Sequence, residues 1–553
     1  MLSRHVNPDE IVNHLREVTA GLSHPASRPN RHITPYSSQY TAQAPIPKFR
    51  LPEEGASADT VYQMIHDEMN LDGKPDLNLA SFVGTWMEPN ATALMNENMN
   101  KNLADADEYP ALMRIHERCI SILGHLWGVR PGEKAVGSAT TGSSEAIHLG
   151  GLAMKRRWQE KRRKEGKDTS KPNIIMGANA QVALEKFARY FEVEPRILPV
   201  SESSQHRLDP KLVKENIDEN TIGVFVILGS TYTGHYEPVE EISKILDQYQ
   251  EETGIDIPIH VDGASGAFIA PFTDAGAGGA KWNFELPRVV SINTSGHKFG
   301  LVYVGLGWII WRDEKYLPES LVFTLDYLGG TEKSFTLNFS RPGAQVILQY
   351  YNLIHLGFNG YREVMENCLR NARLLSRSLE ETGWYTVVSD IHRPVSSSKD
   401  KLKGFLQKAG DFKLGDGSAT SKAMSGMFDE ISSADYVAGL PVVAFRLSDK
   451  FMKEFPLVKQ ESVSQMLRAK QWIIPNYKLP SNEQDTQILR IVVRENMSLD
   501  LLEKLIEDIC VVTETLMDTE GEKADLSKLL TRRHKHRLHF QQGKTPDTHR
   551  GVC

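Results

Sequence analysis

A regular alternation of short apolar strands and amphipathic helices between residues 173 and 311 restricts the fold of this chain more than any other feature. The strand-like NIIMG precedes the helical pattern VALEKFARYFEV, and TIGVFVILG precedes VEEISKILDQYQEETG. Three more apolar stretches follow, which read IPIHVDG, RVVSIN and VGLGWIIW. Strands and helices that alternate at this spacing predict βαβ units with right-handed crossovers. The sequence therefore predicts an α/β protein built on a mostly parallel sheet.

The rest of the chain is expected to surround or follow this sheet. Residues 1–80 predict an N-terminal amphipathic helix and an extended arm, and residues 81–367 would form the large domain that contains the sheet. A smaller α+β domain is expected at 368–519, with a surface insertion near 391–435 that is rich in Ser, Lys, Gly and Asp. Residues 520–553 form a polar, basic tail.

Composition narrows the classes of function. A net charge of −7 gives no reason to expect nucleic acid as a partner. The four cysteines are scattered without the spacing of a metal or redox site, which predicts a reducing compartment and no metal centre. No apolar run approaches the roughly 20 residues of a membrane span, and the N-terminus lacks the apolar core of a secretory signal. We therefore expect a cytoplasmic protein without a membrane partner.

Three groups of polar residues follow predicted strands. Gly142, Ser143 and Ser144 open a helix, where N–H groups and hydroxyls either hold a phosphate or simply cap the helix. Asp262 directly follows an apolar strand, where a carboxylate either caps a turn or faces a cationic ring nitrogen. Lys298 follows RVVSIN on a small-residue turn, where its amine either extends to water or, when desolvated, attacks a carbonyl.

Taken together, these groups match the three parts of one cofactor. Ligands of open α/β sheets bind beyond the carboxyl ends of the strands, where all three groups are expected. A lysine binds an aldehyde, an acid pairs with a pyridinium nitrogen, and a helix N-terminus binds a phosphate. The order of phosphate loop, Asp and Ser-x-His-Lys is more specific than any one part. It predicts pyridoxal 5′-phosphate, which stabilises carbanions by withdrawing electrons.

The chain resembles the glutamate decarboxylases of the bacterial, plant and fungal type, which are fold-type I, aspartate aminotransferase-like pyridoxal-phosphate enzymes. The matching stretches lie between about residue 80 and residue 500, and include FVGTWMEPNATALMNENMNKNLADADEYP, TTGSSEAIHLGGLAMKRRW, HVDGASGAFIAPF, SGHKFGLVYVGLGWIIWRD and ILRIVVRE. The resemblance implies conversion of L-glutamate to 4-aminobutanoate and CO₂. The alternatives are a decarboxylase or lyase for aromatic amino acids or phosphorylated sphingoid bases, and a catalytically silent relative.

The resemblance also implies roles for individual residues. Lys298 would bond to the cofactor aldehyde and later return a proton to Cα, with Tyr327 of an adjacent subunit as a second proton donor. Asp262 would keep the ring nitrogen protonated. The other residues expected around the cofactor are Ser143, Ser144, Gln181, Thr231, Ala264, Ser295, His297 and, from the neighbouring subunit, Ser340.

Substrate recognition is assigned in the same way. The distal carboxylate of glutamate would contact Thr85, Asn102 and Asp105, and the α-carboxylate would pair with Arg490. Arginine suits this role because its guanidinium forms a two-pronged pair with a carboxylate. Arg494 lies on the same strand face by the period of two and competes for the assignment.

Assembly and regulation rest on weaker signals. The resemblance implies at least a homodimer and is compatible with a hexamer. The tail segment LSKLLTRRHKHRLHF is basic and amphipathic, which is typical of some calmodulin targets. His534, His536 and His539 offer an alternative, a plug that responds to pH. A solvated tail without a regulatory role is the interpretation that the sequence favours most.

Overall fold

The computed structural model describes residues 49–273, 280–325, 332–395 and 433–520 of the chain. The chain forms two compact units, residues 1–74 and residues 75–553. In the described part of the first unit, helix α2 (Ala58–Met69) begins after Ser57, whose Oγ accepts a hydrogen bond from the Thr60 N–H at 3.3 Å. The helix expected near the start of the chain, most of the 391–435 insertion and the basic tail lie outside the described residues.

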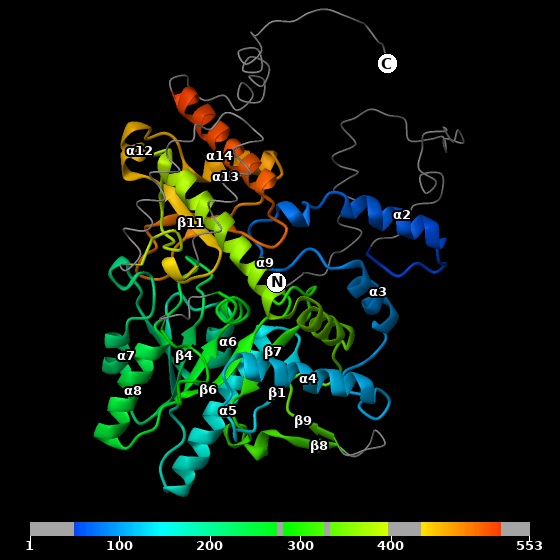
Figure 1. Cartoon of the computed structure of the whole chain (residues 1–553), viewed down its shortest axis with the longest axis vertical. Helices are drawn as coiled ribbons and strands as arrows, with labels where there is room; N and C mark the ends of the chain where they lie inside the picture. The colour runs from blue at the N-terminus through cyan, green and yellow to red at the C-terminus, as the bar shows by residue number, and fades with distance from the viewer. Residues whose placement is uncertain (1–48, 274–279, 326–331, 396–432, 521–553) are drawn as a thin grey trace, which may run out of the picture. The chain divides into compact units, whose positions relative to one another are not determined.

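The second unit contains a seven-stranded sheet with the order β1-β7-β6-β5-β4-β2-β3. Six strands run parallel to one another, and β7 is antiparallel to both of its neighbours. The strands are β1 (Val136–Thr140), β2 (Asn173–Gly177), β3 (Glu194–Leu198), β4 (Thr221–Ile227), β5 (Ile259–Asp262), β6 (Val289–Thr294) and β7 (Gly307–Trp311). The predicted mostly parallel sheet is confirmed (Figure 1).

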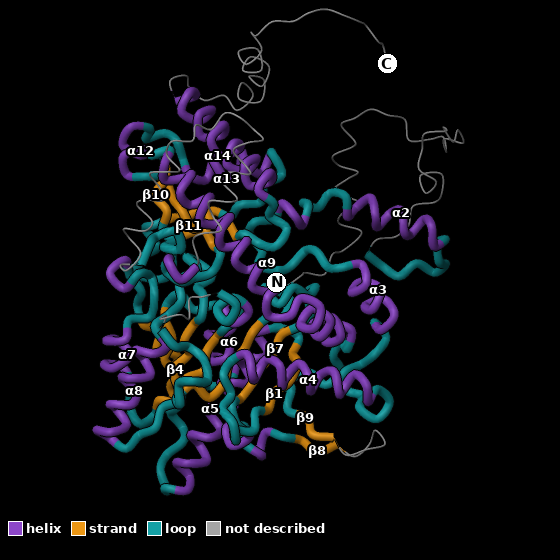
Figure 2. The backbone as a smooth tube through the Cα atoms, in the orientation of Figure 1, coloured by secondary structure: helices purple, strands orange, loops and turns teal. Residues whose placement is uncertain are grey.

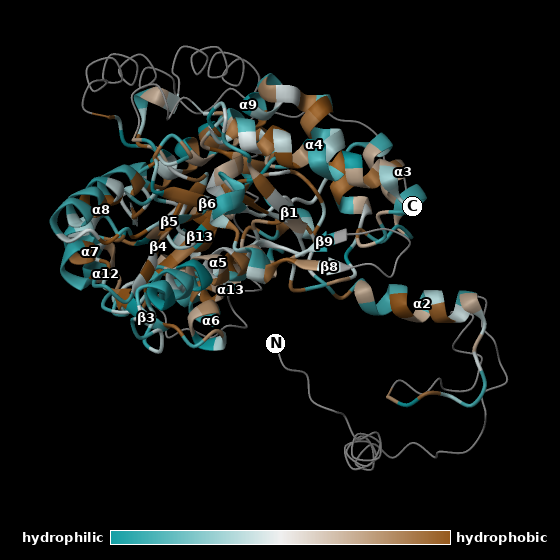
Figure 3. Ribbon diagram, turned by 90° about the horizontal axis from the view of Figure 1, so that it is seen from below, coloured by the Kyte–Doolittle hydropathy of each residue, from teal (hydrophilic) through white to brown (hydrophobic). Residues whose placement is uncertain are grey.

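Helices cover both faces of this sheet, so its strands are apolar on both sides. In β4, Val224 and Val226 join one core, and the alternating Phe225 and Ile227 join the other. The first core includes residues of α4 (Pro110–Leu126), α8 (Val239–Thr253) and the start of α9 (Ala344–Glu381), and the second includes residues of α5 (Ser143–Lys164) and α6 (Val182–Tyr190). Figure 3 shows the brown, hydrophobic strands between these helices.

A smaller antiparallel sheet of order β10-β11-β13-β12 forms a separate core. One face packs against the second half of α9 and against two C-terminal helices (Figure 2). The elements are β10 (Tyr385–Val387), β11 (Val442–Leu447), α12 (Asp449–Glu454), α13 (Gln460–Ala469), β12 (Asn476–Lys478), β13 (Gln487–Val492) and α14 (Leu499–Glu520). This sheet carries Arg490, so it contributes to the candidate site.

Helix α9 connects the two cores and bends at Gly357. Leu348 and Leu353 pack into the core of the large sheet, whereas Leu375 and Leu379 pack into the core of the small one. Gly357 has φ +59° and ψ −169°, a conformation that side chains with a Cβ rarely adopt. Glycine therefore permits the change of direction between the cores.

The remaining described elements are short or lie outside both sheets. Helix α3 (Pro89–Asn98) packs against α9, helix α7 (Pro210–Asn216) packs against α8, and β8 (Phe323–Leu325) pairs with β9 (Glu332–Ser334). None of the described helices combines the length and the apolar character that crossing a membrane requires.

Candidate active site

The carboxyl edge of the large sheet brings the three predicted groups together. Strands β1, β5 and β6 are parallel, so the residues that follow them lie at one edge. Ser143 begins the helix after β1, Asp262 ends β5, and Lys298 lies four residues after the end of β6. Hydrogen bonds from Ser143 to Ser295 and from Lys298 to Ser265 join the loops that follow these strands.

The N-terminus of α5 forms an anion-binding cradle. Ser143 Oγ and Ser295 Oγ are 2.7 Å apart, so two hydroxyls meet at a helix end, where the first N–H groups have no acceptor within the helix itself. His297 closes one side of the cradle, since a Cβ on Gly142 would lie 3.1 Å from its Cε1 atom. Ser144, in the same first turn, is exposed. The cradle can hold a phosphate through N–H groups and hydroxyls.

The imidazole of His297 is held as a neutral hydrogen-bonding group. Burial lowers the pKa of His297 to about 4, and the nearby charge of Lys298 acts in the same direction. Its Nδ1 accepts a hydrogen bond from the Leu306 N–H at 3.2 Å, which leaves the proton on Nε2. His297 can therefore donate one hydrogen bond from Nε2 without adding a charge to the cradle.

Asp262 is a carboxylate in an almost fully buried position, 3 % exposed. Its Oδ1 accepts hydrogen bonds from the Ala264 N–H at 3.1 Å and from Asn293 Nδ2 at 3.0 Å. Within the described ranges, both hydrogen bonds to this carboxylate go to Oδ1. A buried carboxylate that is held by one oxygen is suited to face a cationic partner with the other.

Lys298 is half-buried, and its Nζ donates a hydrogen bond to Ser265 Oγ at 3.4 Å. Burial lowers the pKa of Lys298, Asp262 opposes this shift, and the positive charge of Arg490 adds to it. A lowered pKa increases the fraction of neutral amine, which is the form that attacks a carbonyl. The nitrogen lies 5.3 Å from the centroid of the Phe82 ring.

The two competing arginines on β13 and just beyond it have different surroundings. Arg490 donates hydrogen bonds to the carbonyl oxygens of Thr231, at 2.8 Å, and Ala80, and its guanidinium lies 5.0 Å from the Phe82 ring centroid. Phe82 therefore lies beside both Arg490 and Lys298. The Nε atom of Arg490 is buried without a partner in the described part of the chain.

Arg494 also binds backbone, but through three carbonyl groups rather than two, and its Nε is likewise buried without a partner among the described residues. It donates hydrogen bonds to the carbonyl oxygens of Pro75, Asn78 and Val83, and only 2 % of the residue is exposed. These bonds tie the 75–83 segment to the end of β13. Arg494 thus holds the segment that presents Phe82, whereas Arg490 lies on the side of Lys298.

Three further predicted residues have partners of different kinds. Thr231 contributes its carbonyl oxygen to Arg490. The backbone N–H of Thr85 donates to Glu495 Oε1 at 3.0 Å, and the Thr85 hydroxyl is buried without a partner among the described residues. Gln181 is exposed and caps α6, because its Oε1 accepts the Ala183 N–H at 2.6 Å. In this conformation the amide of Gln181 is engaged by its own helix.

The remaining predicted residues form a separate group. Asn102 Nδ2 donates to Asp105 Oδ1 at 3.1 Å and to Ser340 Oγ at 3.4 Å. Within the described ranges, no hydrogen bond joins these three residues to Lys298 or Asp262. Tyr327 lies outside the described residues.

Sequence reasoning did not single out Phe82 or Ser265, although both contact the predicted lysine. Each was visible only as a member of a longer matching stretch, FVGTW or HVDGASGAF. The residue type of a serine or a phenylalanine does not indicate a catalytic role, so the role could be inferred only from the contacts made in the folded structure.

The residues present fit pyridoxal phosphate. The amine of Lys298 suits an aldehyde, the carboxylate of Asp262 suits a protonated ring nitrogen, and the cradle at Ser143 and Ser295 suits a phosphate. Two buried polar atoms at this edge, Arg490 Nε and Thr85 Oγ1, also lack partners among the described residues. Such atoms are expected where a ligand completes the hydrogen bonding.

Comparison with known proteins gives the same result. The family model described as the pyridoxal-dependent decarboxylase conserved domain matches residues 52–397. Glutamate decarboxylase of Saccharomyces cerevisiae is 48% identical over 85% of this chain and 79% of the relative, and that of Petunia hybrida is 44% identical over 86% and 84%. The solved glutamate decarboxylase of Lactobacillus brevis is 34% identical with a TM-score of 0.74, over 86% of this chain and 96% of that one.

These matches agree both with the fold and with the residues at the carboxyl edge of the large sheet. The family model covers more than half of the chain, and the mostly parallel sheet is that of fold-type I pyridoxal-phosphate enzymes. The chain therefore belongs to the pyridoxal-dependent decarboxylase family, in its glutamate decarboxylase branch, and its cofactor is pyridoxal 5′-phosphate.

Proposed function

We propose that this chain decarboxylates L-glutamate to 4-aminobutanoate and CO₂. The observation that carries the proposal is a lysine of lowered pKa, Lys298, that is bonded to Ser265, shares the Phe82 ring with the buried guanidinium of Arg490 and feels the charge of the buried Asp262. This arrangement provides an amine for the cofactor and a cation for the substrate. The high identity to proteins named glutamate decarboxylase supports glutamate as the amino acid.

Bound pyridoxal phosphate withdraws electrons from the Cα atom of an amino acid, which lets the α-carboxylate leave as CO₂. The role we assign to Lys298 is to hold the cofactor aldehyde and to exchange it for the amino group of the substrate. Its lowered pKa favours this exchange, because a neutral amine is the reactive form.

Asp262 and the cradle would fix the two ends of the cofactor. The negative charge of Asp262 would stabilise a proton on the ring nitrogen and so keep the bound ring electron-poor. Ser143, Ser295 and His297 would bind the phosphate, with Ser144, Gln181 and Ala264 as further contacts and Ser340 supplied by a second subunit.

Arg490 would bind the α-carboxylate of glutamate. Its Nη1 and Nη2 atoms each donate to a carbonyl oxygen, and its Nε is buried without a partner among the described residues, so it has donor capacity left for a ligand. Thr85, Asn102 and Asp105 would recognise the distal carboxylate of glutamate.

Removal of CO₂ leaves Cα to be protonated at one face. Lys298 is our first candidate for the donor, because its Nζ is already held at the centre of the site by Ser265. Tyr327 of an adjacent subunit remains the second candidate. Exclusion of water from this centre would prevent protonation at the wrong carbon.

Assembly, division of the chain and location also remain proposals. We propose a homodimer at least, a domain division near residues 367 and 368, and a cytoplasmic location.

The tail at 520–553 is proposed to be solvated and unregulated, and the two alternatives are calmodulin binding and a pH-sensitive plug. Activity of a chain that lacks residues 520–553, measured at pH 5 and pH 7.5 with and without calcium–calmodulin, separates the three ideas.

The decisive test of the activity is a substrate panel with purified, cofactor-loaded protein. We expect release of CO₂ and 4-aminobutanoate from L-glutamate, and no turnover of L-tryptophan, L-tyrosine or a phosphorylated sphingoid base. Borohydride should reduce the lysine-bound cofactor and abolish its visible absorbance. Turnover of an aromatic amino acid in preference to glutamate would contradict the proposal, and so would a protein that binds cofactor yet turns over none of the panel.

A further inference from the structure

A histidine lies inside the sheet directly behind Asp262. His260 is the second residue of β5, and by the period of two its side chain is on the same strand face as that of Asp262. The residue is 0% exposed, in a strand where apolar residues are the rule. A titratable side chain in such a position requires hydrogen bonds on both ring nitrogens to offset its burial.

Both ring nitrogens of His260 have partners on the neighbouring strand β6. His260 Nδ1 is 2.7 Å from Ser291 Oγ, and Nε2 is 2.7 Å from Asn293 Oδ1. Asn293 Nδ2 in turn donates to Asp262 Oδ1 at 3.0 Å. A continuous chain of hydrogen bonds therefore runs from Ser291 through His260 and Asn293 to the candidate carboxylate.

The chemistry of the groups determines the direction of every bond. A carboxylate only accepts, so the amide of Asn293 must turn its NH₂ toward Asp262 and its oxygen toward His260. His260 then carries its proton on Nε2, and Nδ1 accepts the hydroxyl proton of Ser291. Burial, which lowers the pKa of His260 to about 4 against the opposing effects of Asn293 and Asp262, agrees with this neutral form.

Packing holds the imidazole in one orientation. Gly150 of α5 lies against the ring, and a Cβ at that position would be 2.6 Å from both Cε1 and Nδ1 of His260. The ring also meets Phe225 edge to face, with centroids 5.4 Å apart. The ring cannot turn over without displacing the helix or the phenyl ring, so the tautomer and the orientation are kept together.

We propose that Ser291, His260 and Asn293 form a relay that aims the Asp262 carboxylate at the cofactor ring nitrogen. The inference rests on the proposed function, in which Asp262 faces that nitrogen. The relay occupies Oδ1 with a neutral donor and so leaves Oδ2 and the full negative charge to the cofactor. His260 is in this scheme a positioning residue, because it acts only through Asn293 and Asp262.

The relay fixes the orientation of the side-chain amide of Asn293. If His260 did not donate to Asn293 Oδ1, the amide could rotate and bring its oxygen against the oxygens of Asp262. Two acceptors in contact repel, so the carboxylate would turn away from the ring nitrogen. A charged histidine at position 260 would instead compete with the cofactor for the charge of Asp262.

Two nearly isosteric variants test the relay in the purified apoprotein. His260→Gln keeps a donor near the place of Nε2, whereas His260→Asn reaches only the place of Nδ1. We expect His260→Asn to raise the Kd for pyridoxal phosphate about tenfold or more, equivalent to about 1.4 kcal/mol, and His260→Gln to stay within about threefold of wild type. The thermal unfolding midpoint of the two apoproteins is the control for folding.

Comparison of the cofactor Kd values shows whether His260 positions Asp262 or only stabilises the fold. Equal cofactor Kd values in the two variants, or losses that follow apoprotein stability, would overturn the relay. In an Asp262→Asn background, His260→Asn should have no further effect on cofactor Kd, because the relay acts through the carboxylate. An additive effect in this double variant would also count against it.

The same set of proteins distinguishes failure of the relay from failure of the proposed function. If Asp262→Asn alone binds pyridoxal phosphate as tightly as wild type, Asp262 is not the partner of the ring nitrogen. Both the role of Asp262 in the proposed function and the relay are then wrong. If Asp262→Asn binds weakly but His260→Asn binds normally, only the relay is wrong.

Discussion

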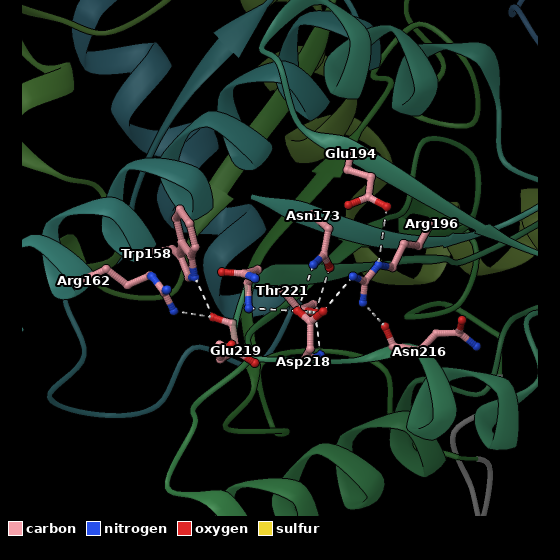
Figure 4. Close-up of polar contacts among 10 residues, drawn as sticks. Trp158, Arg162, Asn173, Glu194, Arg196, Asn216, Asp218, Glu219 and Thr221 are labelled. Carbon is pink, nitrogen blue, oxygen red and sulfur yellow. Dashed lines mark hydrogen bonds and ion pairs between the residues drawn. The ribbon is translucent and has the colours of Figure 1, made fainter. Parts of the chain in front are cut away.

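The two edges of the large sheet hold polar clusters of opposite character. At the amino ends of β2 and β4, Asp218 accepts hydrogen bonds from Asn173 Nδ2 at 2.9 Å, the Asn220 N–H at 2.8 Å and Arg196 Nη2 at 2.6 Å (Figure 4). Thr221 joins the same carboxylate and also donates to Asn173 Oδ1. Both oxygens of the Asp218 carboxylate are therefore bonded, Oδ2 to Arg196 and Oδ1 to the other groups.

The C-terminal half of α5 completes the amino-edge cluster. Trp158 Nε1 and Arg162 Nη1 both donate to the carbonyl oxygen of Glu219 at 3.1 Å (Figure 4). Arg162 belongs to the basic run in the last turn of this helix, and its hydrogen bond ties the helix to the loop before β4. The cluster fastens strands, loop and helix to one another.

At the carboxyl edge, in contrast, several buried polar atoms have no hydrogen-bond partner among the described residues. Thr85 Oγ1, Thr294 Oγ1 and Arg490 Nε are buried without partners in the described part of the chain. Lys298 and Asp262 lie at this edge with few bonds of their own. A polar cluster that saturates itself stabilises a fold, whereas one that remains incomplete is ready for a ligand.

The largest effect should come from Lys298→Ala at the carboxyl edge. Loss of the only group that bonds to the aldehyde should lower the decarboxylation rate at least about a thousandfold, or about 4 kcal/mol in the barrier. Activity of a purified, cofactor-saturated variant measures this, with thermal unfolding as the control. A variant with wild-type activity would show that the open edge is not the site.

Asp262→Asn is expected to rank second. The amide keeps the size of the side chain but removes the charge that stabilises a protonated ring nitrogen, so the rate should fall about a hundredfold. Borohydride should still trap the cofactor on Lys298. A rate within about threefold of wild type, which is below 1 kcal/mol, would exclude this role for Asp262.

The pair Arg490→Lys and Arg494→Lys compares the arginine that shares the Phe82 ring with Lys298 to a neighbour that bonds to three backbone carbonyl groups. Arg490→Lys should raise KM for glutamate about tenfold, because an ammonium cannot form the two-pronged carboxylate pair. Arg494→Lys should lower the free energy of unfolding by about 1–3 kcal/mol and leave KM unchanged, because it loses bonds to buried carbonyl groups. The reverse pattern in steady-state kinetics and urea unfolding would mean that the arginines have exchanged roles.

Asp218→Asn at the amino edge should have the smallest effect, about 1 kcal/mol in the free energy of unfolding, with kcat/KM unchanged. Burial raises the pKa of Asp218, but bonds from Asn173, Arg196 and Asn220 outweigh it and leave the pKa below its ordinary 3.8. A lowered pKa in the folded state adds stability above pH 3.8, and this stability is lost as pH falls through the folded-state value.

Urea unfolding across this pH range measures the contribution of Asp218. The difference in stability between wild type and variant should be constant above about pH 5 and shrink on acidification below it. If Asp218→Asn lowered kcat/KM and left stability unchanged, the amino edge would have a role in catalysis, contrary to the difference between the two edges that we describe.

Much of the fold was predictable because its signals are local. Apolar runs and the 3.6-residue period predicted the alternating strands and helices, and polar residues after β5 and β6 predicted where the chemistry lies. The cofactor followed from three residue types in one order, since aldehyde, ring nitrogen and phosphate each require a different partner. None of these inferences depends on which strand pairs with which.

The choice between Arg490 and Arg494 needed tertiary structure. Both lie on the same strand face by the period of two, so the sequence leaves them equivalent. The 75–83 segment, more than 400 positions away in the chain, binds both arginines through backbone carbonyl groups. It places the Phe82 ring against Arg490. Phe82 itself gains its role only from these neighbours.

The sequence by itself determined the fold class and the family. It also predicted the lysine, the carboxylate and the phosphate loop of the candidate site, because each prediction depends on residue type and local spacing. The tertiary structure alone decided the surroundings of the carboxylate. The register of β5 and β6 shifts between Ile259 and His260, so that His260 lies opposite Ser291 and Asp262 opposite Asn293. Register depends on the pairing of two strands that are distant in sequence and on the packing of both faces, and a one-residue slip would reverse every side chain.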